Sequence, residues 1–343
     1  MVVKLSLHER IFASPETKKL AAAVDEGVAR IELNLESEMR FGDALADVAA
    51  RYLFNAGGKR IRPVLAVLVS QLGSGVSDEI VTAGTAIEMT HLASLYHDDV
   101  MDEAPLRRGV PSAHEVWGNS VAILTGDLLF SRANTIMSRL GSKAAAIQTE
   151  TFERLCLGQL HETIGPSEGD DAVAHYIQVL ANKTGSLISA AARCGVEYSG
   201  APEEFVEPLV TFGDKIGVAF QLADDVIDLD PNAGDTGKQA GTDLRAGVVT
   251  FPTLLLEQAA QTDATAAALL ARIRSDVSTE SAEADADLKL AIAELYAHPV
   301  TQATRDEARR WANEAVDALA PLPDGDVKKA LSAFAEHVVS RTA

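Results

Sequence analysis

The sequence is poor in several features, and each shortage excludes a class of protein. Only two of its 343 residues are cysteines, Cys156 and Cys194, too few for the disulfide framework of a small secreted fold. We therefore expect a reducing compartment and two buried structural thiols. Aromatic residues make up 5% of the chain, which does not suit a stacked β protein. No stretch approaches the ~18 consecutive apolar residues that a membrane span needs.

Basic residues are scarce relative to acidic ones. The chain has 30 Lys and Arg against 50 Asp and Glu, a formal net charge of −20, so the electrostatic footprint of a nucleic-acid-binding protein is not expected. The first ten residues lack the basic-then-apolar layout of a signal peptide. These features predict a cytoplasmic protein without a nucleic-acid partner.

Helical spacing of apolar residues, by contrast, runs from end to end. Apolar residues within 45–53 recur at i, i+3, i+4, i+7 and i+8, which predicts an amphipathic helix that Gly57 and Gly58 end. Residues 78–103 are apolar on almost every side of the expected helix, which predicts a central helix without a solvent-exposed face. Further helices are expected at residues 63–72, 120–140, 144–160, 170–194, 202–229 and 250–261.

No alternation typical of strands accompanies these helices. The sequence therefore predicts an all-α fold, a large helical bundle in a single domain over residues 1–343. Residues 262–287, rich in Ala, Asp, Ser and Glu, indicate a solvated helix pair or loop without chemistry. Residues 300–343 indicate ordinary amphipathic packing helix.

Two carboxylate triplets share one pattern. Residues 98–102 and 224–228 both read D-D-x-x-D, of which about 0.1 copies are expected by chance. On a helix, the first and last Asp of a triplet lie at i and i+4, so both carboxylates can bind one hard cation such as Mg²⁺. Pro105 and Pro231 follow closely, so each triplet ends its helix, where the macrodipole disfavours anions and a cation is expected. The candidate ligands are Asp98, Asp102, Asp224 and Asp228.

Cations lie near these acids in the sequence despite the net negative charge. Residues 57–63, Gly-Gly-Lys-Arg-Ile-Arg-Pro, put three cations on a glycine loop and a helix N-terminus, which favours an anion site. Arg107 and Arg108 follow the first triplet, and Lys238 follows the second. Acids that hold magnesium beside Lys and Arg that hold oxyanions indicate a diphosphate site.

Five motifs in this order resemble those of the trans-polyprenyl diphosphate synthases. They lie within about residues 54–252 and are 57–63, 97–102, 107–109 (Arg-Arg-Gly), 183–185 (Lys-Thr-Gly) and 220–225 (Phe-Gln-Leu-Ala-Asp-Asp). The resemblance implies about ten or more antiparallel helices around a deep central cavity, in a homodimer. It also implies that an allylic diphosphate ionises with help from about three Mg²⁺ ions and that isopentenyl diphosphate then attacks the allylic cation, which lengthens the chain by five carbons.

The resemblance also assigns roles to residues at matching positions. Direct magnesium ligands are matched by Asp98, Asp102 and Asp224, with Asp228 acting partly through water. Positions that hold isopentenyl diphosphate are matched by Lys59, Arg62, His91 and Arg108. The positions that hold the allylic diphosphate are matched by Arg107, Lys183, Gln221 and Lys238. The positions that present oxygens to the developing allylic cation are matched by Thr184 and Gln221. Val248 departs from the family, which usually has lysine there to contact the allylic diphosphate.

Residues that precede Asp98 predict the length of the product. A tail attached to a diphosphate at Asp98 must grow past Ser94 and Ala93 and then Thr90. These residues are small, where short-chain members of the resembling family carry bulky aromatics. The sequence predicts a product of seven to ten isoprene units, handed to a membrane to which the protein is peripheral, although Phe130 on another helix could block its path.

Four alternatives stay open. A twenty-carbon (geranylgeranyl) diphosphate synthase is the runner-up. A non-catalytic regulatory subunit of a heterodimeric synthase typically has eroded motifs. A class I terpene cyclase is the third, but its second metal motif usually mixes Asn, Ser or Thr with Glu, whereas residues 224–228 here are a full D-D-x-x-D. A head-to-head synthase is the fourth, but it would lack the cation-bearing loop that this chain has at 57–63.

Overall fold

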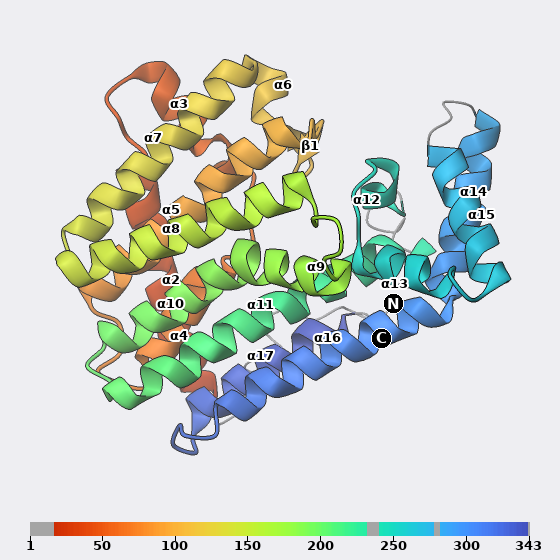
Figure 1. Ribbon diagram of the computed structural model, residues 1–343. Coiled ribbons are helices and arrows are strands. Elements are labelled where there is room, and N and C mark those ends of the chain that lie inside the picture. The colour runs from red at the N-terminus through yellow and green to blue at the C-terminus, as the bar shows by residue number, and fades with distance from the viewer. Residues whose placement is uncertain (1–16, 232–239, 278–281, 342–343) are drawn as a thin grey trace. The chain divides into compact units, whose positions relative to one another are not determined.

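Helices make up almost all of the regular structure in the computed structural model (Figure 1), which describes residues 17–231, 240–277 and 282–341. The predicted all-α fold is confirmed. Contacts divide the chain into two compact units: a first of Met1–Cys156, Ser186–Gly213 and Ala318–Leu331, and a second of Leu157–Gly185, Asp214–Asp317 and Ser332–Ala343. The single domain expected over residues 1–343 and the deep central cavity stay predictions.

The longest helices begin in the first unit. Its elements are α2 (Lys18–Glu38), α3 (Ala44–Asn55), α4 (Ile61–Ser70), α5 (Asp78–Met101), β1 (Leu106–Arg107), β2 (Val110–Pro111), α6 (Ala113–Trp117), α7 (Asn119–Ser138), α8 (Ser142–Ile164), α10 (Ser186–Glu197), η3 (Glu203–Phe205), α11 (Val206–Asp228) and α17 (Asp326–Ser340). The elements that begin in the second unit are α9 (Ala172–Leu180), η2 (Ala181–Gly185), α12 (Thr242–Arg245), α13 (Phe251–Ala259), α14 (Ala264–Val277), α15 (Ala282–Ala297) and α16 (Pro299–Ala318).

Helix α5 is the centre of the first unit, as its apolar sequence predicts. It begins after Ser77, whose Oγ accepts a hydrogen bond from the Ile80 backbone N–H at 3.3 Å and so caps the helix. It contacts α2, α4, α6, α7 and α10 and is buried on almost every side from Ile80 to Tyr96. Side chains on α5 therefore reach the interior of this unit whichever way they point.

Glycines let neighbouring helices of the first unit approach closely. A Cβ atom added to Gly213 on α11 would lie 2.5 Å from Ser189 Cα on α10. A Cβ atom added to Gly195 on α10 would lie 2.8 Å from the Ala66 carbonyl oxygen on α4. A clash with backbone atoms cannot be relieved by a change of rotamer, as a clash with a flexible side chain can. These glycines therefore set the spacing of the three helices.

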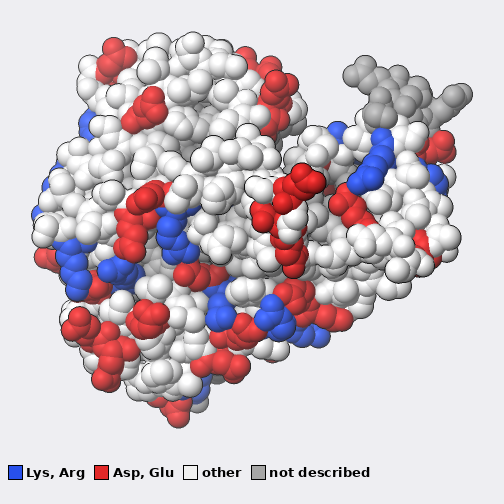
Figure 2. Space-filling model, in the orientation of Figure 1, with Lys and Arg blue, Asp and Glu red and all other residues white. Residues whose placement is uncertain are grey.

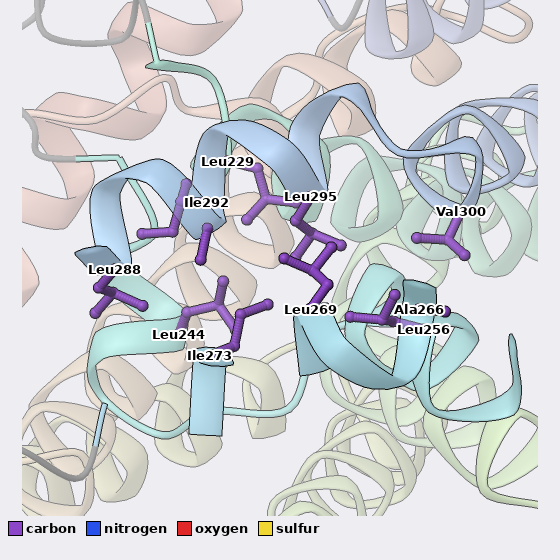
Figure 3. Close-up of a cluster of buried hydrophobic side chains, with 11 residues drawn as sticks. Leu229, Leu244, Leu256, Ala266, Leu269, Ile273, Leu288, Ile292, Leu295 and Val300 are labelled. Carbon is purple, nitrogen blue, oxygen red and sulfur yellow. The ribbon is translucent and has the colours of Figure 1, made fainter. Parts of the chain in front are cut away.

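The second unit has a hydrophobic core of its own. Side chains from α12 to α16 point toward one another there, and the labelled ones include Leu244, Leu269, Ile273 and Ile292 (Figure 3). Within residues 262–287, α14 contributes Ala266, Leu269 and Ile273 to this core, whereas the core residues of α15 begin at Leu288. The described part of this range is therefore helical, but the buried face of α14 contradicts the solvated helix pair or loop that was expected.

The single helix predicted over residues 170–194 is three segments. Helix α9 ends at Leu180, the π-helical turn η2 follows, and α10 begins at Ser186. A π-helical turn holds one residue more than an α-helical turn, and the spacing of apolar residues on either side does not reveal it.

Three smaller expectations are wrong. Leu45 and Val48, on the predicted apolar stripe of α3, are exposed, whereas Leu53 is buried. Cys194 is buried as expected, but Cys156 is exposed. Strands β1 and β2 form a short antiparallel pair in a chain predicted to have none.

The charged surface agrees with the acidic composition. On the face shown in Figure 2, acidic and basic side chains lie in small neighbouring groups, without a broad basic area among the described residues of that face. In the part of the chain that the structure describes, no helix has both the length and the apolarity to cross a membrane.

Gly213→Ala tests the close approach of α10 and α11. The added methyl group would meet the Ser189 backbone, and overpacking of this kind lowers the free energy of unfolding by about 1–3 kcal/mol. Gly325→Ala is the matched control, because nothing lies within 4 Å of a Cβ atom there. Circular dichroism should show a lower midpoint of thermal unfolding for Gly213→Ala alone. Equal midpoints for both variants would mean that the two helices separate without cost.

Candidate functional site

Both carboxylate triplets lie in the last turn of a helix, as predicted. Helix α5 ends at Met101 with Asp102 as its C-cap, and α11 ends at Asp228. Neither helix has a basic residue in its last turn, so nothing on the helix itself offsets the negative end of its dipole. Asp98 and Asp102 lie one turn apart on one face of α5, which suits a shared cation.

The middle carboxylate of the first triplet faces the protein. Asp99 is fully buried and accepts a hydrogen bond from Arg107 Nε at 2.6 Å. Burial raises the pKa of Asp99, while the charge and hydrogen bond of Arg107 oppose that rise. Arg107 lies in β1, so this ion pair fixes the β1–β2 hairpin to the end of α5.

The middle carboxylate of the second triplet is buried in the same way. Asp225 Oδ2 accepts hydrogen bonds from the Tyr176 hydroxyl at 2.8 Å and from the Phe251 backbone N–H at 3.0 Å. Burial raises the pKa of Asp225 to about 7 although both hydrogen bonds oppose it. Asp225 thereby ties α11 to α9 and α13 within the second unit.

The outer carboxylates of the second triplet have charged or polar neighbours. Asp224 is 39% exposed and lies 2.8 Å from Nη2 of Arg341. The Asp228 carboxylate accepts hydrogen bonds from the backbone N–H groups of Thr242 and Asp243, both at 3.1 Å, and so caps α12. Asp224 therefore pairs with a side-chain cation, whereas both oxygens of Asp228 are engaged with backbone.

Arg62, His91 and Arg108, three of the four residues expected to hold isopentenyl diphosphate, lie near one another in the first unit. Lys59 is exposed on the loop before α4, and Arg62 is half-buried in the first turn of that helix. Burial, followed by the charges of Arg62 and Arg108, lowers the pKa of His91 well below its usual value. His91 is therefore neutral near pH 7, beside two guanidinium groups.

Lys183 and Thr184 lie in the π-helical turn η2, a distortion frequent at functional sites. Lys183 Nζ lies 2.5 Å from Glu162 Oε2. A Cβ atom added to Gly217 on α11 would lie 2.5 Å from Gly185 Cα, so the end of η2 touches α11. Gln221 is one turn farther along that face of α11, so the second unit brings the Lys-Thr-Gly motif near Gln221.

The residues predicted to line the product path are buried. Ala93 and Thr90 are fully enclosed, and Ser94 nearly so. Thr90 Oγ1 accepts a hydrogen bond from Nε2 of Gln148 on α8 at 2.7 Å and donates one to the Ala86 carbonyl at 2.8 Å. Gln148 is itself buried and is a polar link between α5 and α8 that the sequence did not suggest.

Aromatic rings from α5, α7 and α8 pack together. The Phe130 and Phe152 rings are 4.4 Å apart between centroids, and the His97 ring is 5.5 Å from Phe130. Lys238 lies outside the described residues. Val248, at the position of the usual lysine, is exposed after α12.

The donor set suits Mg²⁺ in type, because carboxylate oxygens are ligands it prefers. Within residues 17–231, 240–277 and 282–341, no three His, Cys, Asp or Glu side chains are gathered closely enough to hold a metal ion by themselves. Mg²⁺ is usually bound through one or two carboxylates together with waters and substrate phosphates. The triplets therefore fit a cation that is bound jointly with a diphosphate.

Several residues at the site were missed from the sequence. They are Glu88, Gln148, Glu162, Tyr176 and Arg341. Glu88 alone gave a signal, since it is the one acidic residue in the apolar middle of the helix expected at 78–103. The others look like ordinary surface or core residues until the fold places them.

The sequence of this chain is similar to those of polyprenyl synthetases. A model of the polyprenyl synthetase family matches residues 43–290. The nonaprenyl diphosphate synthase of Mycobacterium tuberculosis is 45% identical over 322 residues, which cover 94% of each chain.

Solved structures agree in fold as well as sequence. The polyprenyl synthase from Caulobacter crescentus, complexed with calcium and isoprenyl diphosphate, aligns with a TM-score of 0.84 at 32% identity and 98% coverage of each chain. The geranylgeranyl pyrophosphate synthase from Corynebacterium glutamicum, complexed with the same two ligands, aligns with a TM-score of 0.80 at 37% identity, over 96% of this chain and 99% of that one.

Proposed function

The chain belongs to the polyprenyl synthetase family, and we propose that this prenyltransferase condenses isopentenyl diphosphate with an allylic diphosphate to give a long-chain all-trans polyprenyl diphosphate. The observation that carries the proposal is the presence of a D-D-x-x-D triplet at the C-terminal end of both α5 and α11. Incubation of the purified chain alone with isopentenyl diphosphate, Mg²⁺ and a labelled allylic primer tests it, because a regulatory subunit would elongate no primer.

We assign the metal to the outer carboxylates. Asp98, Asp102 and Asp224 are proposed as direct ligands, and Asp228 as one that acts partly through water, which suits the engagement of its oxygens with α12. Mg²⁺, about three ions, would neutralise the diphosphate of the allylic substrate and assist its departure. The relatives complexed with calcium and isoprenyl diphosphate support divalent metal dependence.

The basic and polar residues divide between the two substrates. Those proposed to hold isopentenyl diphosphate are Lys59, Arg62, His91 and Arg108. Those proposed to hold the allylic diphosphate are Arg107, Lys183, Gln221 and Lys238. Because negative charge grows on the departing diphosphate, the cations on the allylic side stabilise the transition state more than the ground state. Thr184 and Gln221 present oxygens to the developing allylic cation, and no protein nucleophile is required.

We further propose that the protein works as a homodimer. Ile123, Leu124 and Leu128 expose apolar side chains on α7, and a second copy would cover them. The polyprenyl product is apolar, so we propose that a cytoplasmic enzyme, peripheral to the membrane during release, hands its product to the bilayer.

Small residues before Asp98 support a product of seven to ten isoprene units. Ala93 and Ser94 are small and buried at positions where short-chain members of the family carry an aromatic ring that stops a growing tail. Each unit adds roughly 4–5 Å, about one helical turn of 5.4 Å. The 45% identity to a nonaprenyl diphosphate synthase supports the same range.

A twenty-carbon product is the second candidate, and one observation favours it. The hydrogen bond between Thr90 and Gln148 crosses from α5 to α8 on the proposed path. A tail that passed this point would have to break a buried hydrogen bond, which costs free energy unless both groups find other partners.

Asp98→Ala and Asp224→Ala should each lower turnover by orders of magnitude, because each removes a proposed magnesium ligand. Asp306→Ala, at an exposed carboxylate on α16 bonded to Gln302, is the control and should leave turnover unchanged. Steady-state assays measure turnover, electron paramagnetic resonance with Mn²⁺ and substrate measures metal binding, and circular dichroism checks the helices. Near-normal turnover in either variant would remove the metal assignment.

Arg62→Gln and Lys183→Gln should separate the two substrates. Loss of Arg62 should raise KM for isopentenyl diphosphate by about tenfold or more, since a charge-assisted hydrogen bond is lost. Loss of Lys183 should mainly lower kcat and weaken the allylic side, because charge develops on the allylic diphosphate. Equal effects of both changes on both substrates would show that the pockets are misassigned.

Ala93→Phe should shorten the product without abolishing condensation. The ring would fill the path beside α5 and leave the carboxylates at the end of the helix in place. Chromatography of products from ten-, fifteen- and twenty-carbon primers measures the length distribution. A wild-type product limited to fifteen carbons, or an unchanged distribution in the variant, would contradict the proposed path.

A further inference from the structure

Three guanidinium groups, those of Arg60, Arg62 and Arg108, lie near one another at the N-terminus of α4. A Cβ atom added to Gly58 would lie 2.8 Å from Arg60 Nη1 and 3.0 Å from Arg108 Cζ, so both guanidinium groups lie against this glycine. Burial lowers the pKa of Arg62, the charge of Glu88 opposes this, and the charge of Arg108 adds to it. Like charges at this spacing repel one another unless an anion is close.

Glu88 on α5 is that anion. It is 2% exposed, and its Oε1 lies 3.5 Å from Arg60 Nη1. Burial raises the pKa of Glu88, and the charges of Arg62, Arg60 and Arg108 all oppose the rise, so the carboxylate faces the three guanidinium groups. Among the described residues, neither Glu88 Oε2 nor Arg62 Nε has a hydrogen-bond partner, although both atoms are buried.

Arg60 holds the shape of the loop. Its Nη2 donates to the Phe54 carbonyl at 3.2 Å, its Nη1 donates to the Gly57 carbonyl at 3.4 Å, and its guanidinium lies 4.7 Å from the Phe54 ring centroid. Its own backbone has a φ of +50°, which a residue with a side chain rarely adopts. Arg108 reinforces the same loop through the carbonyls of Leu53 and Gly57.

We propose that Glu88 is a positioning residue of this diphosphate cradle, the loop 57–62 with Arg108. Its buried carboxylate holds Arg60 inside the loop and keeps Arg62 and Arg108 side by side before a diphosphate is bound. The proposal rests on the proposed function, because the anion for which the cradle is held is the diphosphate of isopentenyl diphosphate. Buried charges persist where each has a partner, and Glu88 is the buried partner of this group.

The test compares Glu88→Gln with Glu32→Gln in the full chain. Both residues pair with Arg60, but Glu32, 3.0 Å from Arg60 Nε, is 44% exposed and is the matched control. Calorimetry measures the binding of inorganic diphosphate without metal, steady-state assays measure KM for each substrate, and circular dichroism measures thermal stability. Arg60→Lys, which keeps the charge and loses the forked contacts to the loop, is the second variant.

The sign of the effect on binding separates positioning from simple neutralisation. Glu88→Gln removes a negative charge from a site for anions, so it would tighten diphosphate binding if Glu88 only neutralised the arginines. We expect at least tenfold weaker binding and at least a tenfold higher KM for isopentenyl diphosphate, with KM for the allylic substrate changed less than threefold. Glu32→Gln should change each value less than threefold, and Arg60→Lys should match Glu88→Gln.

Diphosphate binding by Glu88→Gln that equals or exceeds that of the wild type would overturn the inference. So would equal losses on both substrates together with a large fall in thermal stability, because these would indicate general damage. A wild type that makes no prenyl product but binds diphosphate in a Glu88-dependent way would refute the proposed function and leave this inference standing. A wild type that binds no diphosphate would refute the cradle itself.

Discussion

Burial of α5 on almost every side is the constraint on which the rest of the first unit depends. A helix in that position cannot leave its polar side chains to water, so each must find a partner in the protein. Every such pair fastens a different neighbour to α5. The partners are Asn34 on α2 for Thr85, Arg60 before α4 for Glu88, Gln148 on α8 for Thr90, the backbone of α3 for Tyr96 and Arg107 on β1 for Asp99. The helix that carries the proposed metal ligands is therefore also the one that positions the surrounding elements.

Each D-D-x-x-D triplet divides its carboxylates between two environments. Consecutive residues on a helix point about 100° apart, so the first and second Asp cannot share a face. Asp99 and Asp225 turn inward, where the one holds Arg107 and the other accepts hydrogen bonds from Tyr176 and the Phe251 backbone. The outer carboxylates remain at the end of the helix, where a bound cation would offset the helix dipole. The doubled aspartate thus provides one anchor and one candidate ligand in a single turn.

Much of the fold and of the candidate site could be predicted from the sequence, because both depend on local periodicity. The bounds of α5 were predicted within about two residues, since unbroken apolar character and the Gly-Ser-Gly before it mark a buried helix. The helix-end position of Asp98 and Asp224 followed from i, i+4 spacing and the prolines beyond. The π-helical turn at Lys183 and the exposure of Leu45 could not be predicted, because the first adds a residue without changing the apolar pattern and the second depends on what packs against α3.

The sequence by itself determined the helical class, the family and the residue types at the proposed site, because each of these is written in local spacing and in motif order. Only the tertiary structure decided which residues meet. Tyr176 reaches Asp225, Gln148 reaches Thr90 and Arg60 reaches Glu88 across 49, 58 and 28 residues of chain. No local pattern encodes such pairs, since they arise when buried polar groups on packed helices must satisfy one another.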